Sequence, residues 1–459
     1  MRVAKSIIAT ILCAVSFYAT TAQVVVNADE VVGKIKVMNA VNNGPAVAGS
    51  TQKRGNAQNY KDAEFGYARL HDAPIAWKWA HTVDISCVFP DFEADEKNPA
   101  SYDFTLTDKL IKDVYDSGTK VFYRLGQSIE HWKKKYGVNP PADFKKWARI
   151  CEHIIRHYNE GWADGFHYDI EYWEIWNEPD LNWKTNNSPT WTGTKEEYFR
   201  LYEITATHLK KNFPNIKVGG PAYAGSAEWL EAFLTHISKR KVAMDFFSYH
   251  AYFATIETAV KHTEGIKTML DKYGYSDMEM ILNEWNYISN WTDEFVYSVE
   301  TISSHKGAAH AAATMQTFQD SYVDMLMYYD ARPAAGFNGL FDLYTMQPRH
   351  PYYALYSWTK LRRLGKQVKA DVGGMKNFYA TAAKNEKGQL ALLLTYYTDD
   401  GNDVAPKPVT IDFKGVAVNE AIAHVSDRFK MHTETPIEIV NSQAQIFMEP
   451  NSYILIEIR

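Results

Sequence analysis

Cysteine is scarce in this sequence. Three cysteines occur among 459 residues, and one of them, Cys13, lies in the N-terminal segment. A chain of this length can bury a hydrophobic core that is stable without disulfides. Cys87 and Cys151 are therefore not required as a covalent link. They can pair in an oxidising compartment, but the sequence favours two buried free thiols.

The sequence also lacks an excess of positive charge. Its 49 Lys and Arg residues are outnumbered by 55 Asp and Glu residues, which gives a net charge of −6. Proteins that bind nucleic acid or anionic membrane surfaces concentrate positive charge on one face, and no basic stripe is present here. Neither partner is therefore expected. His and Asp residues do not cluster at metal-ligand spacing, so we expect no metal and no cofactor.

Long hydrophobic runs are missing except near the N-terminus. The chain begins with a basic segment containing Arg2 and Lys5, continues with an apolar run over residues 7–19, and has small residues up to Ala22. This pattern predicts a signal peptide over residues 1–22 and export to the periplasm or the extracellular space. An uncleaved anchor is the alternative. No membrane span is expected in the mature chain.

Short apolar segments alternate with longer amphipathic ones through most of the chain. The segments predicted as strands are 35–40, 67–70, 120–125, 172–176, 216–219, 245–250, 280–282 and 325–329. Helical patterns between them include 106–117, 141–159, 195–212, 227–238, 257–272 and 306–321. Eight strands separated by helices predict a parallel (β/α)₈ TIM barrel, an α/β fold with its chemistry at the C-terminal ends of the strands.

The C-terminal part has a different pattern. Short strand-like segments cover residues 378–383, 389–397, 409–413, 420–426 and 453–458, with turn-forming residues between them and no helical period. They predict an appended antiparallel β-sandwich. We therefore expect a barrel over residues 23–368 and a sandwich over 369–459. Residues 23–32 are a candidate extra strand of the sandwich.

Two glutamates follow the fourth and seventh predicted strands. Glu178 stands in the segment 173–179 (WEIWNEP), and Glu284 stands in 281–286 (ILNEWN). A carboxyl group is costly to bury at the end of an apolar strand. The alternative for one such glutamate is a surface salt bridge. A pair on different strands is what a glycosidase needs, because one carboxyl protonates the leaving oxygen and the other stabilises or attacks the anomeric carbon.

The two carboxyl groups must differ in protonation at the working pH. A negative Glu284 nearby is expected to raise the pKa of Glu178 and to keep it protonated. Asn177 can donate an amide hydrogen bond to the sugar hydroxyl beside the anomeric carbon. In a retaining enzyme the two carboxyl groups lie about 5–5.5 Å apart, so a separation near ~9 Å would contradict this mechanism.

Several stretches resemble glycoside hydrolase family 39, the family of β-xylosidases and α-L-iduronidase. They are 65–71 (FGYARLH), 102–104 (YDF), 173–179 (WEIWNEP) and 248–252 (SYHAY). With 283–285 (NEW), they also resemble the wider clan of retaining glycosidases on (β/α)₈ barrels. This resemblance implies that Glu178 is the general acid/base and Glu284 the nucleophile. It also implies that Asn177 binds the hydroxyl next to the anomeric centre.

The same resemblance implies roles for residues around the pair. His250 and Tyr252 are expected near the nucleophile, where one of them can hydrogen-bond it and tune its charge. His71 and Arg69 are expected to shape the pocket floor and to orient Glu284. The alternatives are histidines satisfied in the core and an arginine that serves only as a buried ion-pair partner.

Aromatic residues past strand ends are candidate platforms for sugar rings. They are Trp132, Trp183, Trp191 and Trp285. Family members often carry a Trp at the end of the eighth strand, where this sequence has Tyr328. A tyrosine can stack on a sugar but offers less area, so the identity of the first-bound sugar stays open.

The sequence therefore predicts an exported retaining glycoside hydrolase of poly- or oligosaccharides, with a β-xylosidic substrate as the leading hypothesis. One alternative is a barrel protein that binds carbohydrate without cleaving it. Another is a family member specific for arabinose, glucose or a uronic acid. The linkage, the anomeric configuration, exo or endo action and the oligomeric state are not determined by the sequence.

Overall fold

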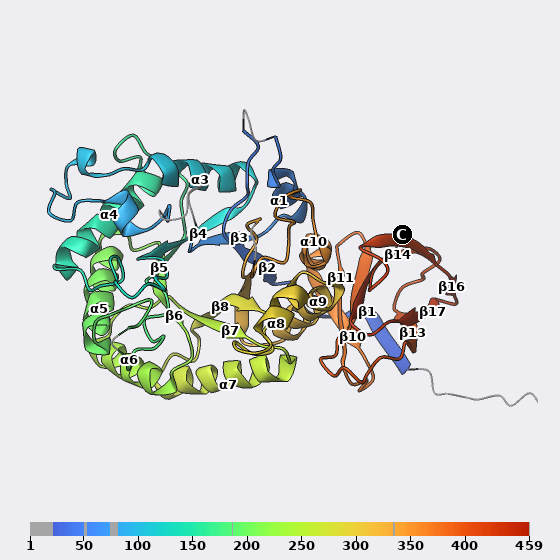
Figure 1. Cartoon of the computed structure of the whole chain (residues 1–459). Helices are drawn as coiled ribbons and strands as arrows, with labels where there is room; N and C mark the ends of the chain where they lie inside the picture. The colour runs from blue at the N-terminus through green and yellow to red at the C-terminus, as the bar shows by residue number, and fades with distance from the viewer. Residues whose placement is uncertain (1–21, 50–52, 74–80, 186, 334–335, 459) are drawn as a thin grey trace, which may run out of the picture.

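The computed structural model describes residues 22–49, 53–73, 81–185, 187–333 and 336–458. The predicted signal peptide lies almost entirely outside these residues. Figure 1 shows two parts, a barrel ringed by helices and a twisted sheet beside it. No helix among the described residues is both long enough and apolar enough to cross a bilayer.

The first part is a closed barrel of eight parallel strands, which confirms the predicted fold class. Its strands are β2 (Val37–Asn42), β3 (Tyr67–Leu70), β4 (Lys120–Leu125), β5 (Tyr172–Ile175), β6 (Lys217–Tyr223), β7 (Phe246–Tyr252), β8 (Glu279–Asn286) and β9 (Val323–Tyr328). The barrel interior is filled by apolar side chains, among them Phe122, Tyr172, Phe246 and Met327. The barrel is therefore packed rather than open as a channel.

Helices cover the outside of the barrel (Figure 1). The α-helices among the described residues are α1 (Ala57–Ala63), α2 (Ile85–Val88), α3 (Thr105–Asp116), α4 (Phe144–Glu160), α5 (Lys195–Asn212), α6 (Ala227–Arg240), α7 (Ile256–Lys272), α8 (Phe295–Ile302), α9 (His305–Gln319) and α10 (His350–Leu364). Local signals set several of their ends. The Asp143 side chain caps α4 by accepting from the amides of Lys145 and Lys146, and Thr194 with Glu197 forms a capping box at α5.

The second part is one ten-stranded, mostly antiparallel sheet. It contains β1 (Ala22–Lys34), β10 (Lys366–Asp371), β11 (Phe378–Lys384), β12 (Leu390–Tyr396), β13 (Lys407–Lys414), β14 (Ala421–Ser426), β15 (Thr433–Ile437), β16 (Ile439–Val440), β17 (Gln443–Met448) and β18 (Ser452–Ile458). The N-terminal strand β1 pairs antiparallel with β10 and parallel with β13. The strands β10, β15, β16 and β17 were not predicted, because their apolar residues are few or interrupted.

Strand β12 shows how the sheet joins the barrel. Leu390, Leu392 and Leu394 point into the core of the sheet itself, whereas Leu393 points into the barrel's core cluster. This alternation follows from the two-residue period of a strand. Helices α9 and α10 lie between the barrel and the sheet (Figure 1), and Gln316 Nε2 of α9 donates to Leu393 O over 2.7 Å. Cys87 and Cys151 are both free thiols.

Candidate active site

The two glutamates lie together at the C-terminal end of the barrel. Glu178 follows β5, and Glu284 lies inside β8 near its end. After β5 the chain turns sharply, with positive φ at Trp176 (75°) and Glu178 (47°). The Glu178 backbone is then held from both sides, because its N–H donates to Ala222 O over 3.1 Å and its C=O accepts from Thr190 Oγ1 over 2.6 Å. The turn therefore begins before Pro179.

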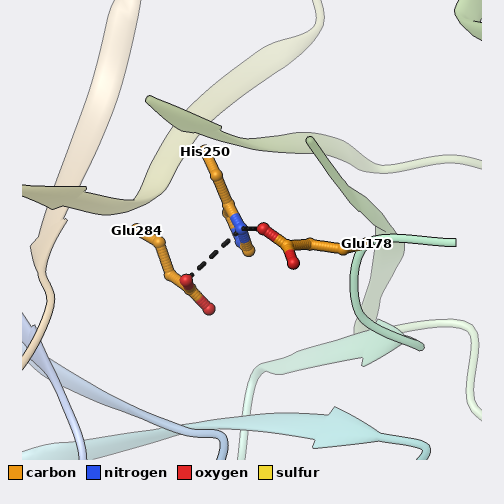
Figure 2. Close-up of side chains that lie close together, drawn as sticks. All are labelled: Glu178, His250 and Glu284. Atoms are coloured by element: carbon orange, nitrogen blue, oxygen red, sulfur yellow. Dashed lines mark hydrogen bonds and ion pairs between the residues drawn. The ribbon is translucent and has the colours of Figure 1, made fainter. Parts of the chain in front are cut away.

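Figure 2 shows Glu178, His250 and Glu284 pointing toward one another. One carboxylate oxygen of each glutamate and a ring nitrogen of His250 all lie within 4.8 Å of one another. An inverting pair of carboxyl groups is separated by about 6.5–9.5 Å to admit a water molecule. The 4.8 Å limit applies to single oxygens rather than to whole carboxyl groups, and it is compatible with a retaining pair, in which one carboxylate attacks directly.

The environment of Glu178 favours a proton. The side chain is buried, and this burial is the main reason that its pKa rises from 4.5 to about 8. Asp72 adds to the rise and Arg69 opposes it. The sequence led us to expect that the charge of Glu284 raises this pKa; the rise is present, but desolvation is its largest cause. At neutral pH Glu178 is mostly protonated, as a proton donor must be.

His250 is the direct partner of Glu178. Its Nδ1 lies 2.6 Å from Glu178 Oε1 and 3.4 Å from Glu284 Oε2. Burial lowers the pKa of His250 to about 4, so the ring is neutral at neutral pH. A neutral imidazole can hold the Glu178 carboxyl in place by one hydrogen bond without forming an ion pair with either glutamate.

Glu284 receives two hydrogen bonds that stabilise its charged form. Arg69 Nη1 donates to Oε1 over 2.6 Å, and the Tyr252 hydroxyl donates to Oε2 over 2.9 Å. The pKa of Glu284 is nevertheless raised, because burial outweighs the opposing effects of His250, Arg69 and Tyr252. Glu284 is thus the carboxyl whose negative charge is compensated, and Glu178 is the one that lacks such contacts.

Arg69 connects this pair to the barrel wall. It is fully buried, and besides Glu284 it binds Glu174 through Nε over 2.7 Å. Its Nη2 donates to Asn177 Oδ1 over 2.7 Å. Because the Asn177 oxygen is used in this way, its amide nitrogen is left as the free donor, with no hydrogen-bond partner among the described residues. Such a donor can bind a sugar hydroxyl.

The residues behind Arg69 were not predicted from the sequence. Glu174 accepts hydrogen bonds from Ser248 and Asn283, and Asn42 accepts from Arg69 Nη1 over 3.1 Å. The signal was present in β5, where Glu174 is a charged residue among apolar and aromatic ones. A buried carboxylate of this kind requires a cationic partner.

His71 lies behind the site rather than on its wall. Its Nε2 is 4.0 Å from Glu284 Oε1 and 3.4 Å from Asp72 Oδ1, and the residue is fully buried. Burial, together with Arg124 and Arg69, lowers the pKa of His71 well below its usual value, so the ring is neutral. Neither His71 nor Arg69 lines the cavity, so both act on a ligand only through other residues.

The glutamates open into a cavity of about 740 Å³, which we call the catalytic cavity. Its described lining includes Glu178, His250, Tyr252 and Glu284, with Trp291, Tyr329 and Phe337 as further aromatic walls. The last three were not predicted. Trp291 follows β8 on a loop and contacts Tyr252 edge-on, with ring centroids 5.2 Å apart. Nothing in the local sequence distinguishes it from other loop aromatics.

Two predicted substrate contacts are wrong. Trp285 and Tyr328 are both buried in the hydrophobic core, where their rings meet edge-on at 5.3 Å. Side chains alternate along a strand, so Trp285 must point away from the cavity when its neighbour Glu284 points toward it. In the same way Tyr329, not Tyr328, reaches the cavity. Trp132 lines a neighbouring cavity rather than the catalytic one.

Glu178, His250 and Glu284 also have the spacing of a three-residue metal site. The same oxygen and nitrogen atoms already contact one another at hydrogen-bond distances. Nδ1 of His250 is therefore already the partner of both carboxyl groups.

The comparison with known proteins agrees with this geometry. The sequence pattern of "Glycosyl hydrolases family 39" matches residues 53–378. The chain belongs to glycosyl hydrolase family 39. The match to family 39 covers the barrel strands from β3 to β9 and both glutamates, which confirms the resemblance found in the sequence.

Individual relatives match shorter stretches. A β-xylosidase of Geobacillus stearothermophilus is 33% identical over 180 residues, which is 36% of this chain and 33% of that protein. A β-xylosidase of Caldicellulosiruptor saccharolyticus is 29% identical over 200 residues, 41% of this chain and 36% of that protein. The aligned stretch is thus about a third of the length of these relatives.

Solved structures share the fold over nearly the whole chain. A glucosidase from Croceicoccus marinus superposes with a TM-score of 0.77 at 22% identity, covering 95% of this chain and 99% of that one. A monomeric β-xylosidase from Caulobacter crescentus gives a TM-score of 0.69 at 15% identity, covering 96% and 99%. At this identity the similarity concerns the fold alone. The superposed region includes both the barrel and the C-terminal sheet.

Proposed function

We propose that this protein is a retaining glycosidase that hydrolyses β-xylosides by double displacement. The observation that carries the proposal is the pairing of Glu178 and Glu284. Their carboxylate oxygens approach within 4.8 Å, yet burial raises the pKa of Glu178 to about 8 while Arg69 and Tyr252 compensate the charge of Glu284. Two carboxyl groups in such different environments divide into an acid and a nucleophile.

In the first step, a carboxylate oxygen of Glu284 attacks the anomeric carbon and forms a covalent glycosyl–enzyme bond. The bond from that carbon to the leaving oxygen breaks, and Glu178 transfers its proton to this oxygen. Arg69 orients the nucleophile, and the unpaired Asn177 amide is the donor that we assign to the neighbouring hydroxyl. Glu178 is then ionised and ready to act as a base.

In the second step, water attacks the same carbon and displaces Glu284. Glu178 accepts the proton of this water, which restores both carboxyl groups to their starting states. His250 contacts both carboxyl groups, so it can keep Glu178 in place while its charge changes. Inversion at the carbon occurs twice, and the product therefore keeps the configuration of the substrate.

The choice of xylose is supported by the two β-xylosidases that match part of the chain. The test is hydrolysis of a panel of aryl glycosides of xylose, arabinose, glucose and uronic acids. We expect the highest kcat/KM on the β-xyloside, with the β-anomer appearing first in NMR spectra of the product. Binding of sugars without hydrolysis of any panel member would contradict the proposal and favour a carbohydrate-binding protein.

The nucleophile role has its own test. A 2-deoxy-2-fluoro xyloside with a good leaving group slows the second step, so a covalent adduct accumulates. Peptide mass spectrometry should find this adduct on Glu284, and Glu284→Ala should form none. A Glu284→Ala variant with undiminished turnover would remove Glu284 from the mechanism.

We also propose that the protein is exported, since the sequence of residues 1–22 has the basic, apolar and small-residue segments of a signal peptide. Mass spectrometry of the protein purified from the periplasm or medium of a bacterial host should give a mature N-terminus at Gln23. Retention of the intact N-terminus in the cytoplasm would contradict export.

A further inference from the structure

The chain segment that follows β12 in the sheet makes hydrogen bonds to the barrel. The Tyr397 hydroxyl donates to the carbonyl of Ala254, two residues past the end of β7. Asp399 Oδ1 accepts from the hydroxyl of Tyr287, the first residue after β8, over 2.8 Å. The same oxygen accepts from Lys306 Nζ of α9 over 2.6 Å. The sheet is therefore bonded to the ends of two neighbouring barrel strands.

These two strand ends carry part of the candidate active site. Strand β7 ends at Tyr252, whose hydroxyl donates to Glu284 Oε2 of β8 over 2.9 Å. The chain segments beyond the strands stay joined, because the Phe253 N–H donates to Asn286 O over 3.2 Å and the Ile288 N–H donates to Phe253 O over 3.4 Å. A displacement of one strand end is therefore passed to the other.

Tyr287 connects the sheet to the wall of the catalytic cavity. It is fully buried and forms a small hydrophobic cluster with two isoleucines. Tyr252 and Phe337, which line the catalytic cavity, pack against this cluster. A buried hydroxyl needs a hydrogen-bond partner, and Asp399 supplies one to Tyr287 from the sheet. The position of the cluster, and of the cavity wall on it, thus depends on Asp399.

A buried histidine packs against the same elements. The His310 ring of α9 is fully buried, with its centroid 4.9 Å from the Phe253 ring and 5.5 Å from the Tyr287 ring. The Trp285 ring of β8 is 6.2 Å from it, and the Tyr397 ring of the sheet is 5.3 Å from it. The sheet therefore contributes a ring to the barrel core behind β8, where close packing transmits small displacements.

The sheet segment is itself fixed. The Tyr397 N–H donates to Asn377 O over 2.9 Å, and the Thr398 N–H donates to Asn451 Oδ1 over 3.0 Å. Both bonds anchor the segment within the sheet, next to Asp399. A carboxylate presented from a rigid element holds its partners within a narrow range of positions.

We infer that Asp399 is a positioning residue of the catalytic site and acts from the sheet through Tyr287. Asp399 is not among the described lining of the catalytic cavity. It holds the segment after β8, against which Tyr252 packs, and so keeps the Tyr252 hydroxyl on Glu284. This inference rests on the proposed glycosidase function, and it makes the appended sheet a working part of that site.

The test measures kcat, KM and the pH profile of the full-length protein on the aryl glycoside that it hydrolyses best. Asp399→Ala should lower kcat about tenfold, because a small misplacement of a reacting group slows the reaction by at least this factor. KM should change less. The acidic limb of the pH profile should move upward, since a weaker hydrogen bond from Tyr252 raises the pKa of Glu284. Asp399→Asn keeps an acceptor oxygen and should retain most of the activity.

Tyr287→Phe gives a second test, which holds even if Asp399→Ala does not fold. It removes only the hydroxyl that Asp399 accepts, and it should give the same loss of kcat and the same shift of the acidic limb. The double variant should lose no more than either single variant, because both changes remove one contact. Losses that multiply in the double variant would show that the two side chains act independently, and would overturn the inference.

Glu457→Ala is the matched control. Glu457 on β18 also joins the sheet to a lysine of a barrel helix, with Oε1 3.4 Å from Lys360 Nζ, but that helix, α10, follows β9 rather than β7 or β8. Its loss should lower the unfolding midpoint in urea as Asp399→Ala does, and leave kcat and the acidic limb unchanged. If Asp399→Ala lowers only the midpoint, or if Glu457→Ala lowers kcat equally, the positioning role is overturned.

Hydrogen exchange measured by mass spectrometry distinguishes failure of this inference from failure of the proposed function, because it needs no substrate. In Asp399→Ala the amides of residues 252–256 and 284–290 should exchange faster than in the wild type, and in Glu457→Ala they should not. If the wild type hydrolyses no glycoside, the proposed function fails and this comparison decides whether the sheet holds the strand ends. Equal exchange in the wild type and Asp399→Ala overturns the inference.

Discussion

Arg69 and Glu284 form a buried ion pair, with Nη1 2.6 Å from Oε1. The same guanidinium binds Glu174 and the oxygen of Asn177. One side chain on β3 therefore positions Glu284 on β8 and the Asn177 amide next to Glu178 after β5. The two glutamates are thus linked through one guanidinium group inside the barrel, Glu284 directly and Glu178 through its neighbour Asn177.

Loss of Arg69 should be costly for stability. Arg69→Met leaves Glu174 and Glu284 without their cation inside the barrel, and we expect the free energy of unfolding to fall by about 3–5 kcal/mol. Urea unfolding followed by circular dichroism measures it. Arg363→Met is the control, because its pair with Glu64 is half-exposed and worth at most about 1 kcal/mol. Equal losses in both variants would contradict this role.

If Glu178 is the acid, the loss of activity in Glu178→Gln should depend on the leaving group of the substrate. Glutamine cannot donate the proton, so kcat/KM on xylobiose should fall by about 10²–10⁴-fold. A dinitrophenyl xyloside needs little protonation, and formation of its glycosyl–enzyme should be much less affected. Steady-state and burst-phase kinetics on both substrates separate these cases. If the rate of glycosyl–enzyme formation fell by a similar factor on both substrates, Glu178 would not be the acid.

The activity should fall at alkaline pH. Glu178 donates a proton only while it is protonated, and burial raises its pKa to about 8. We therefore expect kcat/KM to decline as the pH rises through about 8 in the free enzyme. A pH profile measured on xylobiose tests this. A decline centred near the ordinary glutamate pKa would show that burial does not hold the proton.

The stability of the folded protein should also depend on pH through Glu178. Between pH 4.5 and about 8 the unfolded chain releases the Glu178 proton while the folded protein keeps it. The folded state then binds more protons, so this group lowers stability as the pH rises through that window. Glu178→Gln lacks the titration, and its Tm should gain on the wild type from pH 4.5 to 8. A constant Tm difference would contradict the raised pKa.

Tyr252→Phe should weaken the nucleophile without unfolding the protein. The lost hydroxyl donates to Glu284 Oε2 over 2.9 Å, and a hydrogen bond to a charged group contributes about 1.5–3 kcal/mol. Removing it raises the pKa of Glu284, so kcat should fall about tenfold or more and the acidic limb of the pH profile should move upward. Tyr328→Phe, a buried tyrosine away from the cavity, is the control and should leave that limb in place.

Two tryptophans should separate packing from binding. Trp285 is fully buried, so Trp285→Ala should lower the free energy of unfolding by about 3–5 kcal/mol. Trp291 is 56% exposed on the wall of the catalytic cavity, so Trp291→Ala should raise KM and leave the unfolding midpoint in urea nearly unchanged. A raised KM in Trp285→Ala together with a loss of stability in Trp291→Ala would instead support Trp285 as a substrate contact.

The sequence by itself determined the barrel and the positions along it of the two glutamates that we propose as acid and nucleophile. Period and composition locate the strands, and both glutamates end apolar runs, so counting strands was enough to place Glu178 after the fourth barrel strand and Glu284 on the seventh. These are local signals, carried by neighbours in the chain. These signals are reliable because a carboxyl group without a partner is not tolerated in a buried apolar strand.

Only the tertiary structure decided which aromatic rings face the ligand space and what controls the pKa of Glu178. Whether Trp285 or Trp291 reaches the cavity depends on strand alternation and on where a loop folds back. The high pKa comes from burial by residues far apart in the chain, and the neighbouring cavity is built from segments after different strands. Desolvation and cavity walls are sums over contacts in space, which no single stretch of sequence encodes.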